Sequence, residues 1–94
     1  MAARLEAQAQ ADIRDATAYI ARHDRLAARR WAAEVRGRVR SLGEMPGLGA
    51  PRFEVLPGLR LLPFEGYNVL YVQEGNDVVI LRVVHGARAW ERLV

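Results

Sequence analysis

The chain has 94 residues, 51% hydrophobic and 27% charged, which is the composition of one folded domain spanning residues 1–94. It has no cysteine, which excludes disulfides and thiolate metal sites, and no apolar run near the ~20 residues that cross a bilayer. Because the N-terminus also lacks a signal-peptide core, we expect a cytoplasmic protein without membrane contact. The net charge of +3 comes from fourteen arginines with no lysine, which suits either nucleic acid or an acidic protein partner.

The first half of the chain is predicted to be helical. Residues 1–5 are weakly apolar and would form a short edge strand or a frayed end. From about Ala7 to Arg22 alanine is frequent, and apolar residues recur at helical spacing on one face. This face, which we expect to meet the core, holds Ala9, Ile13, Ala16 and Ile20.

A second helix is predicted from about Arg25 to Gly43. Asp24 is a favourable N-cap, because its carboxylate can accept from the first free backbone amides of that helix. Its apolar seam, at steps of four, four and three, is Trp31, Val35, Val39 and Leu42. Since only a few residues separate the two helices, they should pack as an antiparallel hairpin.

Arginines occupy the face of the second helix away from its apolar seam, at positions 29, 36 and 40. Glu34 stands four residues before Arg38, and Glu44 four residues after Arg40, so part of this charge is predicted to be locally paired. We therefore favour a solvated helix face over a phosphate-binding stripe.

The second half is predicted to be a three-stranded antiparallel meander. Proline and glycine within residues 45–51 end the second helix and form a loop. Strands are then predicted over Leu59–Phe64, Tyr67–Gln73 and the apolar run that begins at Asp77, with turns between them. The fold class is therefore α+β: a short N-terminal strand, an antiparallel helical hairpin and the meander.

Alternation along the last strand separates its two faces. Val79, Leu81 and Val83 share one face, which we expect to meet the helices. Arg82 lies on the other face with Val78, Ile80 and Val84. One helical hairpin can cover only one face of a sheet, so the second face is predicted to be partly open. Apolar surface beside fixed positive charge suits a protein partner or an anion.

The polar residues offer little catalytic chemistry. No glycine pattern matches a nucleotide loop, and the two histidines, His23 and His85, lack ligand spacing, so no cofactor or metal is expected. A possible acid–base cluster for RNA cleavage contains His85, Arg82, Arg60 and Arg88, with Tyr67 or Tyr71. We favour the competing interpretation, in which His85 is a strand-end residue that hydrogen-bonds to the backbone.

The chain resembles the ParE family of toxins from type II toxin–antitoxin systems, within the RelE/ParE superfamily. The resemblance extends over about eighty residues and is strongest in VVILRVVHGAR, at Val78–Arg88. It is also carried by Ala11–Ala21, Ala27–Arg52 and Pro57–Val72. It implies a RelE/ParE-like fold, a ParD-like antitoxin that wraps the toxin in a hetero-oligomeric complex, and DNA gyrase as the target, with growth arrest. It implies no hydrolase activity and no sequence-specific DNA binding.

The RelE branch of the same superfamily supplies the alternative function, a ribosome-dependent mRNA endoribonuclease using Arg60, Arg82 and His85. Members of that branch often end in a Tyr or His, whereas this chain ends in AWERLV after Arg88. A third possibility is a toxin that only binds its antitoxin. The candidates for antitoxin or target contact are Arg60, Tyr67, Tyr71, Arg82, His85, Arg88, Trp90 and Arg92.

Overall fold

The computed structural model describes residues 2–94, so Met1 of the predicted N-terminal strand lies outside the described residues. Short 3₁₀ turns at Pro46–Leu48 and Glu91–Leu93 accompany two helices and five strands in this part of the chain. In chain order they are β1 (Ala3–Leu5), α1 (Ala7–Ala21), α2 (Arg25–Glu44), β2 (Ala50–Pro51), β3 (Leu59–Phe64), β4 (Tyr67–Glu74) and β5 (Asp77–His85). The predicted α+β class and element order are confirmed.

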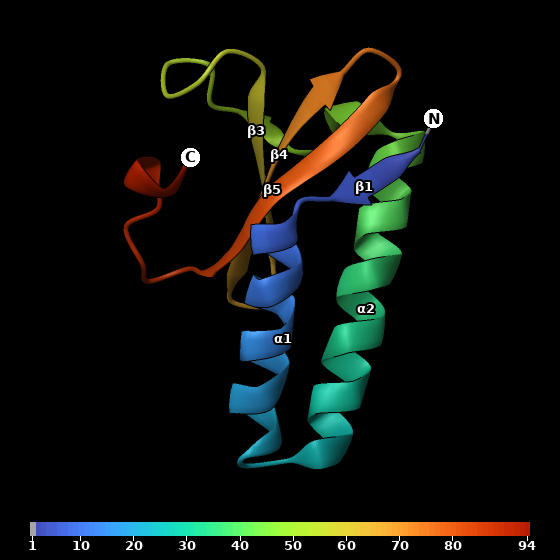
Figure 1. Ribbon diagram of the computed structural model, residues 1–94, viewed down its shortest axis with the longest axis vertical. Helices are drawn as coiled ribbons and strands as arrows, with labels where there is room; N and C mark the ends of the chain where they lie inside the picture. The colour runs from blue at the N-terminus through green and yellow to red at the C-terminus, as the bar shows by residue number, and fades with distance from the viewer. Residues whose placement is uncertain (1) are drawn as a thin grey trace.

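The five strands form one sheet in the order β1-β5-β4-β3-β2 (Figure 1). Strands β3, β4 and β5 are antiparallel neighbours, as the meander requires. Strand β1 pairs in parallel with β5, with Ala3 opposite Val78 and Leu5 opposite Ile80. The sheet is therefore mixed, and the apolar strand β5 is hydrogen-bonded on both sides along its first half.

The helical hairpin lies against one face of the sheet, and its turn projects beyond the sheet (Figure 1). Asp24 caps α2 as predicted, since its Oδ1 accepts from the Ala27 amide at 3.0 Å. Both predicted apolar faces are buried in the core except at Ile20, which is half-buried: Ala9, Ile13, Ala16, Trp31, Val35, Val39 and Leu42. The helices thus supply one side of a core whose other side is the sheet.

A β-bulge interrupts the pairing of β4 with β5. Tyr71 stands opposite Ile80, but the preceding residue Leu70 stands opposite Arg82. The residue between them on β5, Leu81, consequently has no partner on β4. An extra residue of this kind reverses the faces of all residues beyond it.

The bulge corrects the predicted faces of β5. Val78 and Ile80 before it, and Val83 after it, belong to the core under the helices. The prediction was right for Val83 and wrong for Val79 and Leu81, which lie on the opposite face, where Leu81 packs against a second apolar cluster. A prediction from strict alternation fails here, because the extra residue of a bulge reverses the faces of the residues that follow it.

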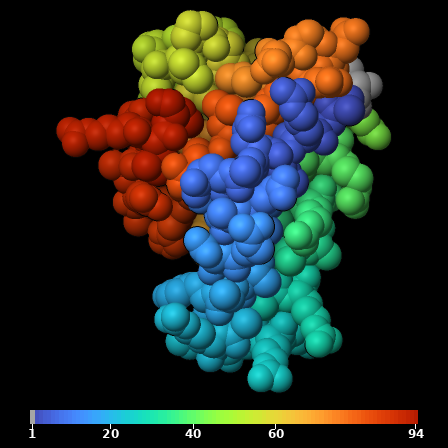
Figure 2. Space-filling view, viewed as in Figure 1, coloured from blue at the N-terminus to red at the C-terminus, as the bar shows by residue number. Residues whose placement is uncertain are grey.

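The second face of the sheet is more covered than predicted. Its buried cluster is formed by Leu59, Leu70, Val84 and Trp90. Half-buried residues from the loop before β3 and from the chain end, including Val55 and Val94, pack around it. The space-filling view shows the C-terminal residues (red) against that loop (yellow-green), over the sheet (Figure 2). The last residues of the chain therefore complete a small second core.

No helix within residues 2–94 is long and apolar enough to cross a membrane.

Candidate partner-binding surfaces

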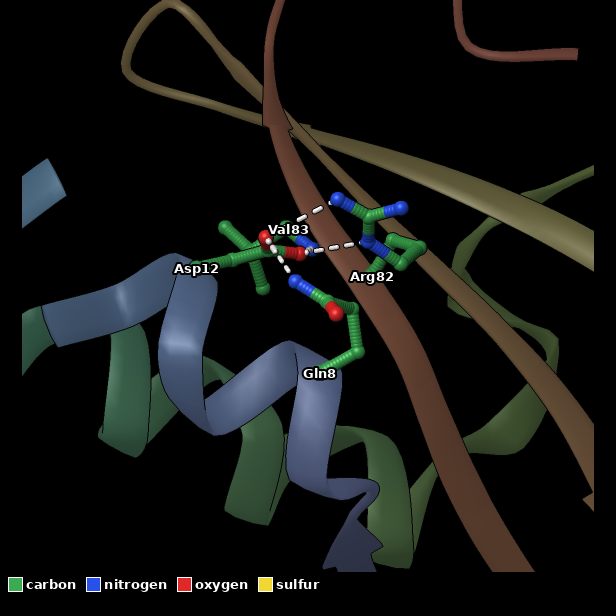
Figure 3. A network of polar contacts seen from close by, with 4 residues as sticks. All are labelled: Gln8, Asp12, Arg82 and Val83. Carbon is green, nitrogen blue, oxygen red and sulfur yellow. Dashed lines mark hydrogen bonds and ion pairs between the residues drawn. The ribbon is translucent and has the colours of Figure 1, made fainter. Parts of the chain in front are cut away.

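Arg82, the one charge inside the apolar strand β5, is held by Asp12 of α1 (Figure 3). Its Nε donates to Asp12 Oδ2 at 2.8 Å and its Nη2 to Oδ1 at 3.0 Å. The Val83 amide also donates to Oδ2, at 2.9 Å, and Gln8 Nε2 donates to Oδ1 at 3.3 Å. The two side chains of the ion pair are only 13% and 9% exposed, so this bidentate pair joins α1 to β5 inside the fold.

The ionisation of the two groups follows from this network. Burial raises the pKa of Asp12, but hydrogen bonds from Arg82, Val83 and Gln8 and the charge of Arg82 outweigh it. The net result is a pKa below the ordinary value of 3.8. The hydrogen bond to Asp12 raises the pKa of Arg82, although burial opposes this, so both groups are charged at neutral pH.

Tyr71 and Arg60 fix the loop that follows α2. The Tyr71 hydroxyl donates to the Pro46 carbonyl at 2.6 Å and accepts from the Gly49 amide at 2.7 Å. Arg60 Nη1 donates to the Gly49 carbonyl at 2.8 Å. Burial raises the pKa of Tyr71, although the Gly49 hydrogen bond and the charge of Arg60 oppose this. Both predicted site residues thus hold a loop in place.

A groove of about 320 Å³ lies where the helical hairpin meets the ends of β4 and β5. The ring of Tyr67 packs against Trp31 at 5.0 Å and edge-on against His85 at 5.3 Å between centroids. Burial and, to a smaller extent, nearby Tyr19 raise the pKa of Tyr67. The groove is lined by Tyr19, Ile20, Ala27, Arg30, Trp31, Glu65, Tyr67 and His85. It is aromatic with one cation and one carboxylate at its walls, which suits a peptide segment.

The eight candidate residues fall into three groups by exposure. The side chains of Tyr71 and Trp90 are buried, and those of Arg60, Tyr67 and Arg82 are half-buried. His85, Arg88 and Arg92 are exposed. Among the eight, the structure brings Tyr67 and His85 together at the groove and Arg60 and Tyr71 together at the loop. Of the other four, Arg88 contacts His85 through its backbone amide, while no side-chain hydrogen bond, ion pair or ring contact in residues 2–94 joins Arg82, Trp90 or Arg92 to either place.

His85 makes the local backbone contact that we favoured for it. Its Nδ1 accepts from the Ala87 amide at 3.2 Å, and its carbonyl accepts from the Arg88 amide at 2.9 Å. These bonds shape the turn that leaves β5.

The predicted charge pairs on α2 are wrong. Glu34 lies 3.6 Å from Arg30, one turn before it, and within residues 2–94 no ion pair joins Glu34 to Arg38 or Arg40 to Glu44. A spacing of four residues permits such a pair in either direction, and here the preceding arginine takes the carboxylate.

Two residues that organise these sites were missed in the sequence. Helical spacing puts Asp12 on the polar side of α1 with Asp15, and nothing in the sequence marks its carboxylate as the partner of Arg82. Gly49 was read only as a loop residue, yet a Cβ there would lie 2.7 Å from the Tyr71 ring. Neither partner was identifiable, because each pair is separated by many residues along the chain.

The fold is that of a small α+β protein of the RelE/ParE-like class. A solved structure described as the chromosomal ParDE TA system from P. aeruginosa shares this fold with a TM-score of 0.76. The two are 23% identical, and the match covers 90% of this chain and 95% of that one.

The sequence gives the family. Residues 3–90 match the family of the ParE toxin of type II toxin-antitoxin system, parDE, and the chain belongs to that family. It is also similar to Toxin ParE3 of Caulobacter vibrioides, with 44% identity over 45 residues. Those residues are 48% of this chain and 45% of that protein, so the alignment spans about half the length of the curated relative.

Proposed function

We propose that the free protein inhibits DNA gyrase and thereby blocks DNA replication, and that a ParD-like antitoxin neutralises it in a hetero-oligomeric complex. The observation that carries this proposal is the ParE family match across residues 3–90. The β5 ending HGAR, at residues 85–88, lies within that match.

We further propose that the protein acts by binding and not as an enzyme. A ribonuclease built on Arg60, Arg82 and His85 would need these side chains around one phosphate. Arg60 and His85 stand opposite Tyr71 and Tyr67, which are four residues apart on β4. That separation is at least about 13 Å along the sheet. Each of the three side chains also has its own partner within the fold.

The groove between the hairpin and the sheet is the surface that we assign to the antitoxin. Its aromatic walls offer the kind of pocket in which a partner buries an anchoring side chain. Arg30 lines it and is exposed, so a carboxylate of the antitoxin would find a cation there.

A gyrase assay tests the target. Purified protein should inhibit supercoiling or accumulate cleaved DNA, and prior addition of the cognate antitoxin should abolish either effect. Absence of both effects at saturating protein contradicts gyrase as the target. Primer extension after induction is the companion measurement: cuts within translated codons, with replication unaffected, would establish the ribonuclease alternative instead.

Two matched variants test the groove. Tyr19 lines it and is 57% exposed, whereas Phe53 lies outside it and is 52% exposed. Tyr19→Asp should weaken antitoxin binding by about tenfold or more, as expected for an aromatic contact. Phe53→Asp, which also replaces an aromatic side chain by a carboxylate, should change antitoxin affinity little. Equal losses in calorimetric titrations would place the antitoxin elsewhere.

A further inference from the structure

The positive charge of the protein is concentrated on one segment. Residues 22–40 hold seven of the fourteen arginines but only two of the eleven acidic residues, so this segment has a charge of +5. The rest of the chain has a charge of −2. The net charge of +3 is therefore the sum of a strongly basic segment and a weakly acidic remainder.

Four of these arginines form a single stripe along α2. Arg25, Arg29, Arg36 and Arg40 follow one another at steps of four, seven and four, which places them within about 60° around the helix axis. All four are exposed, and the stripe is about 22 Å long at 1.5 Å per residue. Between its halves lie two alanines at positions 32–33, and Arg36 Nη1 donates to the Ala32 carbonyl at 3.5 Å.

The acidic residues of the segment do not neutralise this stripe. The carboxylate of Asp24 accepts from the Ala27 amide at the start of α2. Glu34 faces Arg30, which is not part of the stripe, at 3.6 Å. In residues 2–94 no carboxylate lies within ion-pair distance of the four stripe arginines. Their charge is available to a partner.

We infer that this stripe binds the phosphate backbone of B-form duplex DNA independently of sequence. Phosphates along duplex DNA attract such a row of cations, and the release of condensed counterions drives the association. The major groove of B-form DNA is wide enough to admit an α-helix, whereas that of A-form RNA is too narrow. The inference does not depend on gyrase as the target.

Other partners fit the stripe less well. Recognition of single strands uses aromatic side chains for stacking, and the positions between the stripe arginines hold alanine. An acidic protein partner would use aromatic anchors beside the cations, and the aromatic groove, where the hairpin meets the ends of β4 and β5, is lined by none of the stripe arginines. Duplex DNA needs neither feature.

Fluorescence anisotropy with a labelled mixed-sequence duplex of ~20 base pairs, without gyrase or antitoxin, tests this inference. Four phosphate contacts predict a slope of about −3.6 for the logarithm of affinity against the logarithm of salt concentration. Affinity should therefore fall roughly 150-fold between 50 and 200 mM salt. Two unrelated duplex sequences should bind equally.

The key variant replaces the stripe arginines, as R25Q/R29Q/R36Q/R40Q. Glutamine is a comparable helix former, so α2 should stay folded, which circular dichroism verifies. Its matched control is R4Q/R14Q/R88Q/R92Q, which removes four exposed arginines outside residues 22–40 and gives the same net charge. The stripe variant should lose nearly all binding and salt dependence, while the control keeps most of both. A single change in the stripe should reduce the slope by about one.

Three results would overturn the inference. The first is absence of duplex binding at 50 mM salt. The second is an equal loss in both quadruple variants, which would mean that net charge alone matters. The third is tighter stripe-dependent binding of single-stranded RNA or of a polyglutamate peptide, at equal anionic charge, than of the duplex.

Discussion

Asp12 and Arg82, seventy positions apart in the chain, form a bidentate ion pair that fastens α1 to the strand β5. The pair lies just beyond the end of β1, which pairs with β5 only as far as Ile80. Beyond that point the Val83 amide has no β1 residue beside it, and Asp12 accepts from it instead. One carboxylate therefore satisfies both a half-buried cation and a backbone amide at the strand edge.

Removal of Asp12 should be strongly destabilising. Asp12→Ala leaves the Arg82 guanidinium and the Val83 amide without this acceptor, which should lower the free energy of unfolding by about 3 kcal/mol. Asp15→Ala, on the exposed side of the same helix, is the control and should change it by less than about 0.5 kcal/mol. Urea titrations measure both, and similar losses would contradict a structural role for the pair.

The same carboxylate should make stability depend on pH. Its folded-state pKa lies below the unfolded value near 3.8, so the folded state binds fewer protons than the unfolded state in acid. The stabilisation is complete above about pH 5 and is lost as the pH falls through the folded pKa. The difference in unfolding free energy between the wild type and Asp12→Asn should therefore stay constant from pH 7 to 5 and shrink below it. A constant difference down to pH 3 would refute this linkage.

Gly49 should be sensitive to substitution although its φ of −76° suits any residue. A Cβ there would lie 2.7 Å from both Cε1 and Oη of Tyr71, whose ring is fully buried and cannot move aside. Gly49→Ala should cost about 1–3 kcal/mol. Gly47→Ala, two residues earlier, meets nothing within 4 Å and should be tolerated. Thermal unfolding of the two variants measures this difference. Equal melting temperatures would show that the loop moves to accommodate the added Cβ.

Substitution of Trp90 should lower the stability of the fold, whether or not this residue contacts a target. It is 6% exposed in the second core, with the Arg52 guanidinium 4.8 Å from its ring. Trp90→Ala should cost about 3–5 kcal/mol, and Trp90→Phe should cost clearly less. Arg52→Gln should cost only about 0.5–1 kcal/mol, through the lost cation–π contact. If Trp90→Ala instead folds as stably as the wild type but fails to inhibit gyrase, the residue contacts the target.

Local pattern predicted the elements well. The 3.6-residue period marked both helices, and Asp24 marked the start of α2, because these signals depend on neighbours within one or two turns. The strands β3 and β4 were likewise predicted nearly to their ends. The two-residue strand β2 was predicted as loop, since nothing in Ala50–Pro51 itself favours pairing with β3.

The candidate site was predicted less well than the fold. Residue type predicted that Arg82, Tyr71 and Trp90 contact other molecules. In the structure Tyr71 and Trp90 are buried, and the half-buried Arg82 is paired with Asp12. The groove residues Tyr19 and Trp31 were seen only as members of helices. The type of a residue does not show whether its side chain already has a partner within the fold.

By itself, the sequence determined the helices, the meander and the family-bearing run Val78–Arg88, since each depends on residues close together in the chain. Only the tertiary structure decided the parallel pairing of β1, the bulge beside Arg82 and the acceptor that this arginine finds in Asp12. The pairing of β1 and the contact of Asp12 with Arg82 bring together segments about seventy residues apart, whereas the bulge shifts the register of two neighbouring strands. Local preference cannot specify such a contact, because either partner could be satisfied by water or by another residue in the unfolded chain.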